Sequence, residues 1–113
     1  MTDILVLPKF IPWQATVGQH PKAQQFKFVI YPTEKDWMVQ TIKNGPSTYR
    51  VDLPSSWWGE SAEVLQQTYG LEDVVFVHKN GFIAASKTLH GALEMAKLAI
   101  EASQSQEVSD EKV

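Results

Sequence analysis

Residues 74–100, VVFVHKNGFIAASKTLHGALEMAKLAI, decide the fold, because two strands, a turn and a helix follow one another there. Val74 to His78 is a short apolar run typical of a buried strand, and Phe82 to Ala85 is the return strand. Asn80-Gly81 between them is the dipeptide that two-residue hairpin turns prefer, since both turn residues need positive φ. Apolar residues then recur at helical spacing from 89 to 100, which predicts a helix with one buried stripe.

The chain before this stretch carries the same kinds of signal. Phe26 to Tyr31 and Trp37 to Ile42 alternate with the period of two that strands impose, so we expect an antiparallel hairpin. The other expected elements are an edge strand at Ile4 to Leu7, a short helix at Pro12-Trp13 and a helix from Glu60 to Tyr69 stopped by Gly70. Together they predict an α/β fold of the α+β type: a single mixed, largely antiparallel β-sheet of about four or five strands, with two main helices packed on one face.

Length and composition set the outer limits. The 113 residues, 43% hydrophobic and 20% charged, suit one hydrophobic core and are too few for two. We expect one globular domain at residues 1–103 and a disordered acidic tail at 104–113. The chain has no cysteine, no apolar run long enough to cross a membrane and no secretory signal pattern, and a cytoplasmic setting fits these features.

Charge is unevenly distributed along the chain. Four acidic residues and one lysine fall in residues 101–113, which leaves nine basic and nine acidic groups in residues 1–100. Tight, nonspecific binding of a nucleic-acid backbone draws on released counterions and normally needs a surplus of lysine and arginine. The balanced body of the chain therefore argues against such binding.

Short segments along the chain match a known family in order and spacing. In the second half they are Phe76-Val77-His78, Gly81-Phe82-Ile83, Thr88, Gly91-Ala92-Leu93 and Met95-Ala96. Before these they are Ile4-Leu5-Val6-Leu7, Pro12-Trp13, Phe28-Val29-Ile30-Tyr31, Trp37, Val39-Gln40, Arg50, Leu53-Pro54, Trp57 and Gly59. On these residues the chain resembles the melanocyte-proliferating-gene, or MYG-type, group of DHH-superfamily phosphoesterases, whose members are described as metal-dependent RNA exonucleases.

The resemblance is to the C-terminal, DHH-associated half of that family, the substrate-side domain that faces the catalytic domain across a cleft. It implies a module without catalytic residues of its own, because the metal-binding motifs of the catalytic half have no counterpart in this sequence. The chain departs from the family at Ala84-Ala85-Ser86, where Gly-Gly-His is usual in a substrate-binding turn, and at Trp58, where an arginine occurs. Both departures remove groups suited to binding a ligand.

The histidines offer little for catalysis or metal binding. His20, His78 and His90 are not spaced as ligands within one segment, so a metal site would have to be assembled from distant parts of the chain. His78 beside the hairpin turn is interpreted either as a strand-end residue bonded to backbone or as a ligand contact, and as a general base it would need an orienting partner. We expect no metal and no resident cofactor.

Ser86-Lys87-Thr88 is the leading candidate for a ligand site. It precedes the last helix, where free N–H groups and the positive end of the helix dipole favour an anion. Two hydroxyls and an ammonium, all expected at the surface, would complete a site for a small phosphate-containing ligand. The alternative is that Thr88 only caps the helix and Lys87 is solvated. Gly91 in the first turn indicates close packing against the hairpin.

The remaining candidate ligand contacts are Arg50, Trp58 and His78. Of the adjacent tryptophans, we expect Trp57 to anchor its loop in the core and Trp58 to stay partly exposed, for stacking on a ligand or for a protein interface.

Three functional classes remain open. The chain is a module that binds a small ligand or nucleotide, an assembly subunit that binds a DHH-type catalytic subunit or a second copy of itself, or a stand-alone metal-dependent phosphoesterase or nuclease. The third class requires metal-ligand clusters or paired acids, which the sequence does not show. We therefore expect binding or assembly rather than catalysis.

Overall fold

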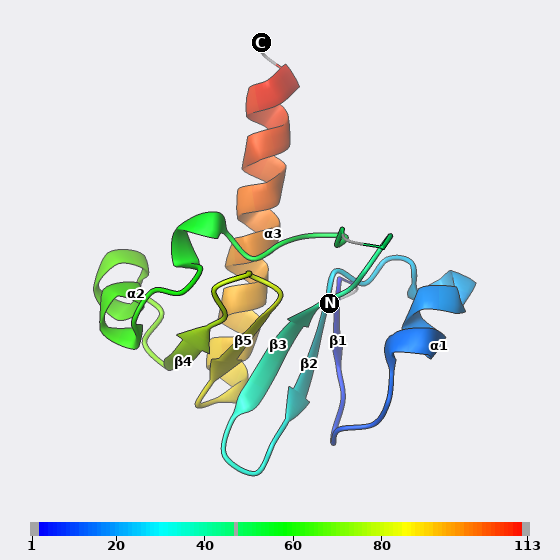
Figure 1. Cartoon of the computed structure of the whole chain (residues 1–113), viewed down its shortest axis with the longest axis horizontal. Helices are drawn as coiled ribbons and strands as arrows, with labels where there is room; N and C mark the ends of the chain where they lie inside the picture. Colours follow the sequence, from blue (N-terminus) through cyan, green and yellow to red (C-terminus); the bar gives the residue numbers. More distant parts are fainter. Residues whose placement is uncertain (1–2, 47, 112–113) are drawn as a thin grey trace.

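In the part of the chain that the structure describes, five strands form one mixed sheet in the order β1-β2-β3-β5-β4 (Figure 1). The structure is a computed structural model and describes residues 3–46 and 48–111. β1 and β2 run parallel, and the other neighbouring pairs are antiparallel, so the predicted mixed, largely antiparallel sheet is confirmed. The strands are β1 (Ile4–Val6), β2 (Phe28–Pro32), β3 (Trp37–Thr41), β4 (Val74–Val77) and β5 (Ile83–Ser86).

The pairing of β3 with β5 joins the two predicted hairpins into one sheet. Val39 in the middle of β3 lies opposite Ile30 on β2 and opposite Ala84 on β5. β3 is therefore paired along both of its edges and forms the centre of the sheet. The first hairpin, β2-β3, and the second, β4-β5, are both present as predicted.

Among the described residues, the sheet is accompanied by three α-helices: α1 (Gln14–Gln19), α2 (Ala62–Tyr69) and α3 (Leu89–Glu111). α2 begins after Ser61, whose hydroxyl accepts the Val64 N–H at 3.2 Å, and it ends at Gly70, which has a φ of 72°. The helix predicted for 60–69 and its glycine stop are confirmed. Within residues 3–46 and 48–111, no helix combines the length and the apolar character needed to cross a membrane.

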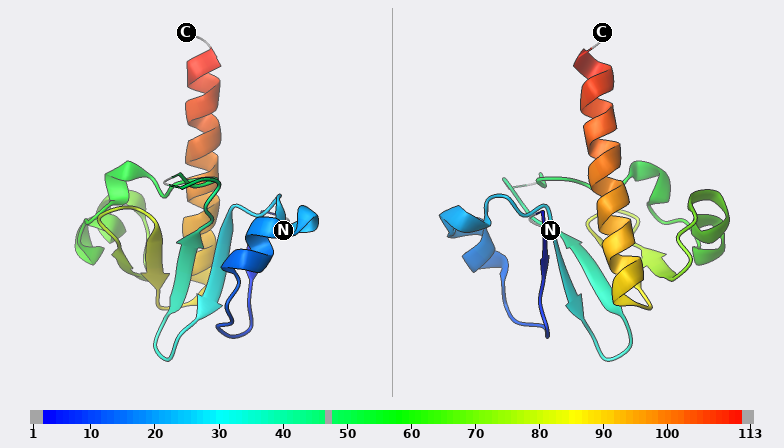
Figure 2. Two further views of the ribbon diagram at one scale, coloured as in Figure 1. Left: turned by 45° about the vertical axis from the view of Figure 1, so that its right-hand side comes forward. Right: turned by 180° about the vertical axis from the view of Figure 1, so that it is seen from behind.

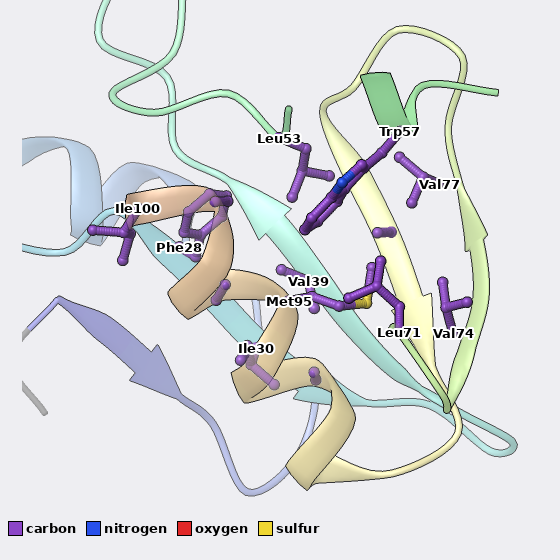
Figure 3. Packing of buried hydrophobic residues seen from close by; sticks show 14 of the residues in the cluster. Phe28, Ile30, Val39, Leu53, Trp57, Leu71, Val74, Val77, Met95 and Ile100 are labelled. Atoms are coloured by element: carbon purple, nitrogen blue, oxygen red, sulfur yellow. The ribbon is translucent and has the colours of Figure 1, made fainter. Parts of the chain in front are cut away.

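Different helices cover the two faces of the sheet (Figure 2). On one face, the apolar stripe of α3 packs against β2 and β3, and Figure 3 shows Met95 and Ile100 beside Phe28 and Val39. The other face of β2 packs against the segment of α1 in a second cluster formed by Leu7, Trp13, Val17, Ala23, Val29, Tyr31 and Ile42. The two predicted main helices, α2 and α3, both contribute to the first cluster. The short helix α1 covers the second face, because both faces of β2 are apolar and each needs a cover.

The turn between β4 and β5 is longer than Asn80-Gly81 predicts. The His78 N–H donates to the Ile83 carbonyl at 2.9 Å, and the Gly81 N–H donates to the His78 carbonyl at 2.9 Å. Gly81 has a φ of 72°, whereas the φ of Asn80 is not positive. This is a type I turn followed by a left-handed glycine, so the expected two-residue turn is wrong while the need for glycine is confirmed.

α3 continues beyond the core and projects from the rest of the fold (Figure 1, Figure 2). Its core contacts reach Ile100, whereas Glu101, Ala102 and Gln104 are exposed. The helix includes residues 104–111, for which the sequence predicts a disordered tail. The proposed end of the globular domain near Ser103 stays a prediction, and a truncation experiment tests it.

Candidate functional site

Asp73, in the loop before β4, organises the start of α3. Its carbonyl accepts the Lys87 N–H at 2.8 Å and the Ser86 hydroxyl at 3.3 Å. Its carboxylate accepts the Thr88 hydroxyl at 2.6 Å, and Thr88 Oγ1 in turn accepts the Gly91 N–H at 3.0 Å. Thr88 therefore caps α3, as predicted, and its hydroxyl also ties the cap to Asp73.

Ser86 is not at the surface, contrary to the expectation. It is 0% exposed, because β5 extends to this residue and pairs it with Trp37 and Val74. Its Oγ also accepts the Thr88 N–H at 3.4 Å, so the hydroxyl is used inside the fold. Lys87 and Thr88 are exposed, as expected.

Acidic side chains surround this helix start. A pocket of about 210 Å³ lies beside it, and its lining residues include Glu72, Asp73, His90 and Glu94. Three carboxylates repel a phosphate, whereas the ammonium of Lys87 and the start of the helix attract one. Anion binding at Ser86-Lys87-Thr88 stays a prediction, and the structure shows the charges it has to overcome.

His78 lies at the opposite end of the hairpin from Thr88. Its Nδ1 accepts the Asn80 N–H at 3.0 Å, and its ring packs against the Phe82 ring with the centroids 4.7 Å apart. With Nδ1 occupied as an acceptor, the proton of the neutral imidazole belongs on Nε2. The interpretation of His78 as a strand-end residue bonded to backbone is confirmed.

Trp58 closes the loop of residues 50–59 onto the hairpin turn. Its indole Nε1–H donates to the Leu53 carbonyl at 2.8 Å, and its ring lies so close to Gly81 that any side chain at position 81 would collide with it. Trp58 is half-buried, whereas Trp57 is 4% exposed within the main core. The predicted burial of Trp57 and partial exposure of Trp58 are confirmed, and stacking or an interface at Trp58 stays a prediction.

Arg50, the only arginine of the sequence, fastens the connection between α1 and β2. Its guanidinium donates to the carbonyls of Ala23 and Phe26 at 2.8 Å each, and to the carbonyl of Val17 at 3.3 Å. Arginine suits this task because its planar group presents several donors in a fixed geometry. No local pattern around Arg50 indicates this role, since the three acceptors are backbone atoms far away in the chain.

The six predicted site residues do not meet in one site. Arg50 and Trp58 line a shared pocket of about 500 Å³ between their loop and α3. His78 lies at the hairpin turn, and Ser86-Lys87-Thr88 lies at the other end of β5. Across the described part of the chain, no three His, Cys, Asp or Glu side chains are grouped so that they could hold a metal ion.

A cleft that the sequence did not single out lies where β3 ends. Its volume is about 760 Å³, and its lining includes Gln14, Lys43, Tyr49 and Phe82. None of the six predicted site residues is among its lining residues. In the sequence, the sign of this cleft is the pair of aromatic residues beside turns, Tyr49 and Phe82. They come together because β3 pairs with β5, which the sequence alone does not show.

Comparison with known proteins shows that the chain matches one protein family. The MYG1 exonuclease family model, described as Uncharacterised protein family (UPF0160), matches residues 1–100. The chain is 36% identical over 106 residues to the MYG1 protein of Schizosaccharomyces pombe, covering 88% of this chain and 33% of that protein. It is 37% identical over 94 residues to the MYG1 exonuclease of Homo sapiens, covering 76% of this chain and 25% of that protein.

A third relative agrees with these two. The MYG1 protein of Dictyostelium discoideum is 38% identical over 101 residues, which cover 83% of this chain and 31% of that protein. No solved structure matches the chain significantly. The chain thus spans about a quarter to a third of the length of the three relatives. Because the family model extends over residues 1–100 and thus nearly the whole sequence, the chain belongs to the MYG1 exonuclease family, UPF0160.

Proposed function

We propose that this chain is a non-catalytic binding or assembly module of the MYG1 exonuclease family. In this proposal it corresponds to the C-terminal, DHH-associated, substrate-side half of such an enzyme and works with a catalytic domain that these 113 residues do not supply. The human relative is named an exonuclease, and the matched part of the chain covers 25% of it, a share that suits one domain of a larger enzyme.

The observation that carries the proposal is how the polar candidate residues are used. Arg50 binds three backbone carbonyls, and Ser86 and Thr88 bind Asp73. His78 accepts a backbone N–H. Each of these side chains holds a loop or a helix cap in place, and metal-assisted hydrolysis would instead need carboxylates or histidines that converge on the metal ions.

The proposal includes partners and a compartment. The catalytic partner is a DHH-type subunit or domain, self-association is the alternative assembly, and the ligand is a small phosphate-containing molecule. Phe10 is 55% exposed and Ile11 is 42% exposed, so apolar surface that an assembly would cover is present near β1. We place the protein in the cytoplasm, which its cysteine-free sequence permits.

A hydrolysis assay tests the non-catalytic part of the proposal. The purified chain is incubated with RNA, DNA and nucleotides in Mn²⁺ or Mg²⁺, beside a mock preparation from host cells without the chain and a full-length MYG1 exonuclease as positive control. We expect turnover in the positive control alone. Metal-dependent hydrolysis that co-elutes with the chain through two different columns would overturn the proposal in favour of a stand-alone phosphoesterase or nuclease.

A capture experiment tests the assembly part. The tagged chain is purified from its native cells under mild conditions and the bound proteins are identified by mass spectrometry. A co-purifying DHH-type protein, absent from a control with an unrelated tagged domain, supports assembly with a catalytic subunit. A chain that elutes alone in native cell extract contradicts assembly and leaves ligand binding as the proposed role.

A further inference from the structure

None of the six predicted site residues lines the cleft at the end of β3, so the cleft is a separate candidate site. Its volume of about 760 Å³ falls within the range of roughly 300 to 1,000 Å³ typical of small-ligand pockets. Its walls come from α1, from residues 40–43 and from the β4–β5 turn. It therefore lies at the opposite end of β5 from Ser86-Lys87-Thr88, and the two places can be tested separately.

Main-chain contacts position the two aromatic residues of the cleft. Phe82 is fixed through its carbonyl, which accepts both the N–H and the hydroxyl of Thr41 at 3.0 Å. Tyr49 is fixed by a bridge to Lys43. Both rings are half-buried, so each keeps part of its surface open. Partly exposed aromatic residues of this kind suit the stacking of a planar ligand.

Amide side chains supply polar contacts around these rings. The Gln40 Oε1 accepts the Tyr31 hydroxyl at 2.9 Å, which leaves the amide hydrogens of Gln40 as donors. Gln14 and Asn80 also line the cleft and are exposed. Primary amides offer donors and acceptors together, as the edges of nucleobases do.

The charge of the cleft favours an anion. Of the described residues that line it, Lys43 alone is charged, and none is an aspartate or glutamate. The chain as a whole has a net charge of -3, and the pocket at the start of α3 contains three acidic residues. A negatively charged ligand is therefore repelled less at the cleft than beside Asp73.

We propose that this cleft binds a nucleoside monophosphate, with the base packed against Tyr49 and Phe82 and the phosphate on Lys43. The site deepens the proposed function, because it gives the phosphate-containing ligand of that proposal a location. Trp13, which is 4% exposed and lines the cleft, has a buried indole N–H without an acceptor among the described residues, and its resonance serves as a local reporter.

The test is an NMR titration of the ¹⁵N-labelled full chain with AMP and UMP, beside adenosine and inorganic phosphate. We expect AMP and UMP to shift the resonances of residues 14–18, 40–43, 49 and 80–82 and the indole N–H of Trp13 in a saturable way. Adenosine lacks the phosphate and inorganic phosphate lacks the ring, so each should bind more weakly. The resonances of residues 86–91 should not shift together with those of the cleft residues.

Matched variants separate the ring and the charge from general effects on folding. Tyr49→Phe keeps the ring and should bind AMP like the wild type, whereas Tyr49→Leu should weaken binding at least about five-fold, because stacking on the ring is lost. Lys43→Gln should weaken AMP binding without changing adenosine binding, and Lys87→Gln should change neither. The dispersion of each variant's spectrum shows that it is folded.

Each outcome that contradicts the nucleotide site points to a different conclusion. AMP shifts no larger than those of inorganic phosphate would reduce the cleft to a simple anion site and overturn the inference. Shifts confined to residues 86–91 would overturn it in favour of the helix start, and no saturable shift would overturn it outright. Metal-dependent hydrolysis by the purified chain would overturn the non-catalytic proposal instead, and it would leave a nucleotide site in this cleft untouched.

Discussion

Gly91 in the first turn of α3 lies against Ser86 at the end of β5, so closely that a Cβ atom on Gly91 would collide with the Ser86 hydroxyl. The same atom would stand 2.9 Å from the Cβ of Asp73. The close approach of α3 to the hairpin, which the sequence indicates by placing glycine within a helix, is confirmed. Glycine here is a packing requirement and not a turn, since its φ is not positive.

Overpacking in Gly91→Ala should by itself cost about 2–3 kcal/mol of unfolding free energy, because the added Cβ would meet Ser86 and Asp73 at once. This loss should exceed the gain of about 1 kcal/mol that alanine brings to a helix. Urea denaturation measures the change. Gly18→Ala in α1 is the matched control, because nothing lies within 4 Å of its added Cβ, and it should be neutral or stabilising. A Gly91→Ala variant as stable as the wild type would contradict the packing argument.

Arg50→Lys should destabilise the fold although it keeps the charge. Lysine cannot reach three separate carbonyls with fixed geometry, so the carbonyls of Val17, Ala23 and Phe26 lose donors. We expect a loss of about 2 kcal/mol and faster amide hydrogen exchange in residues 17–26. Lys9→Gln at an exposed position is the control and should stay within about 0.5 kcal/mol of the wild type. Equal exchange rates in Arg50→Lys and wild type would refute this role.

Thr88→Ala should cost about 0.5–2 kcal/mol of stability, because it removes the cap of α3. Thr88→Ser keeps the hydroxyl that binds Gly91 and Asp73, so it should retain most of that stability. Thermal unfolding followed by circular dichroism compares the two variants. Equal losses in both would show that the methyl group, and not the cap, stabilises this position.

Anion binding at the same helix start is tested on Asp73. If phosphate binds there, Asp73→Asn should strengthen binding by removing a carboxylate, and Lys87→Gln should weaken it by removing the ammonium. Phosphate titration followed by NMR at residues 86–91 measures both changes. Absence of saturable shifts in the wild type and in Asp73→Asn would leave this segment as a capped helix start and nothing more.

Tyr31 should make stability fall at high pH. Burial raises the pKa of Tyr31 above its ordinary value of 10.0, so the folded chain holds the phenolic proton more firmly than the unfolded chain. This contribution is complete below pH 10.0 and is lost as the pH rises from there through the folded pKa. The difference in unfolding free energy between wild type and Tyr31→Phe should therefore shrink above pH 10.0. A difference that stays constant over this range would argue against a raised pKa.

Deleting residues 104–113 should leave the melting temperature nearly unchanged. The core contacts of α3 extend to Ile100, and the following described side chains at 101, 102 and 104 are exposed. The truncated and full chains are compared by calorimetry. A drop of about ten degrees, well above what 1 kcal/mol causes in a domain of this size, would show that the last turns of α3 contribute to the fold.

Local patterns were sufficient to predict most of the elements and not the site. The apolar run of Phe28 to Tyr31 and the stop at Gly70 depend on a few neighbouring residues, so strands and helices follow directly from the sequence. The roles of Arg50 and Asp73 depend on groups distant in the chain, and no local pattern contains them. The turn at Asn80-Gly81 shows the same limit, because the φ of Asn80 is set by the hairpin around it.

The pairing of Val39 with Ala84 also determines the order in which the fold can be completed during synthesis. The strands β1, β2 and β3 leave the ribosome first. The edge of β3 that pairs with β5 then stays open until β5 is made, and the apolar face of β2 and β3 stays uncovered until α3 is made. Until then the nascent chain presents an open strand edge beside an apolar surface, the combination that invites wrong pairing. The strands β1 to β3 therefore depend on the prompt arrival of β5 and α3, and a translational pause between residues 46 and 83 should favour wrong pairing.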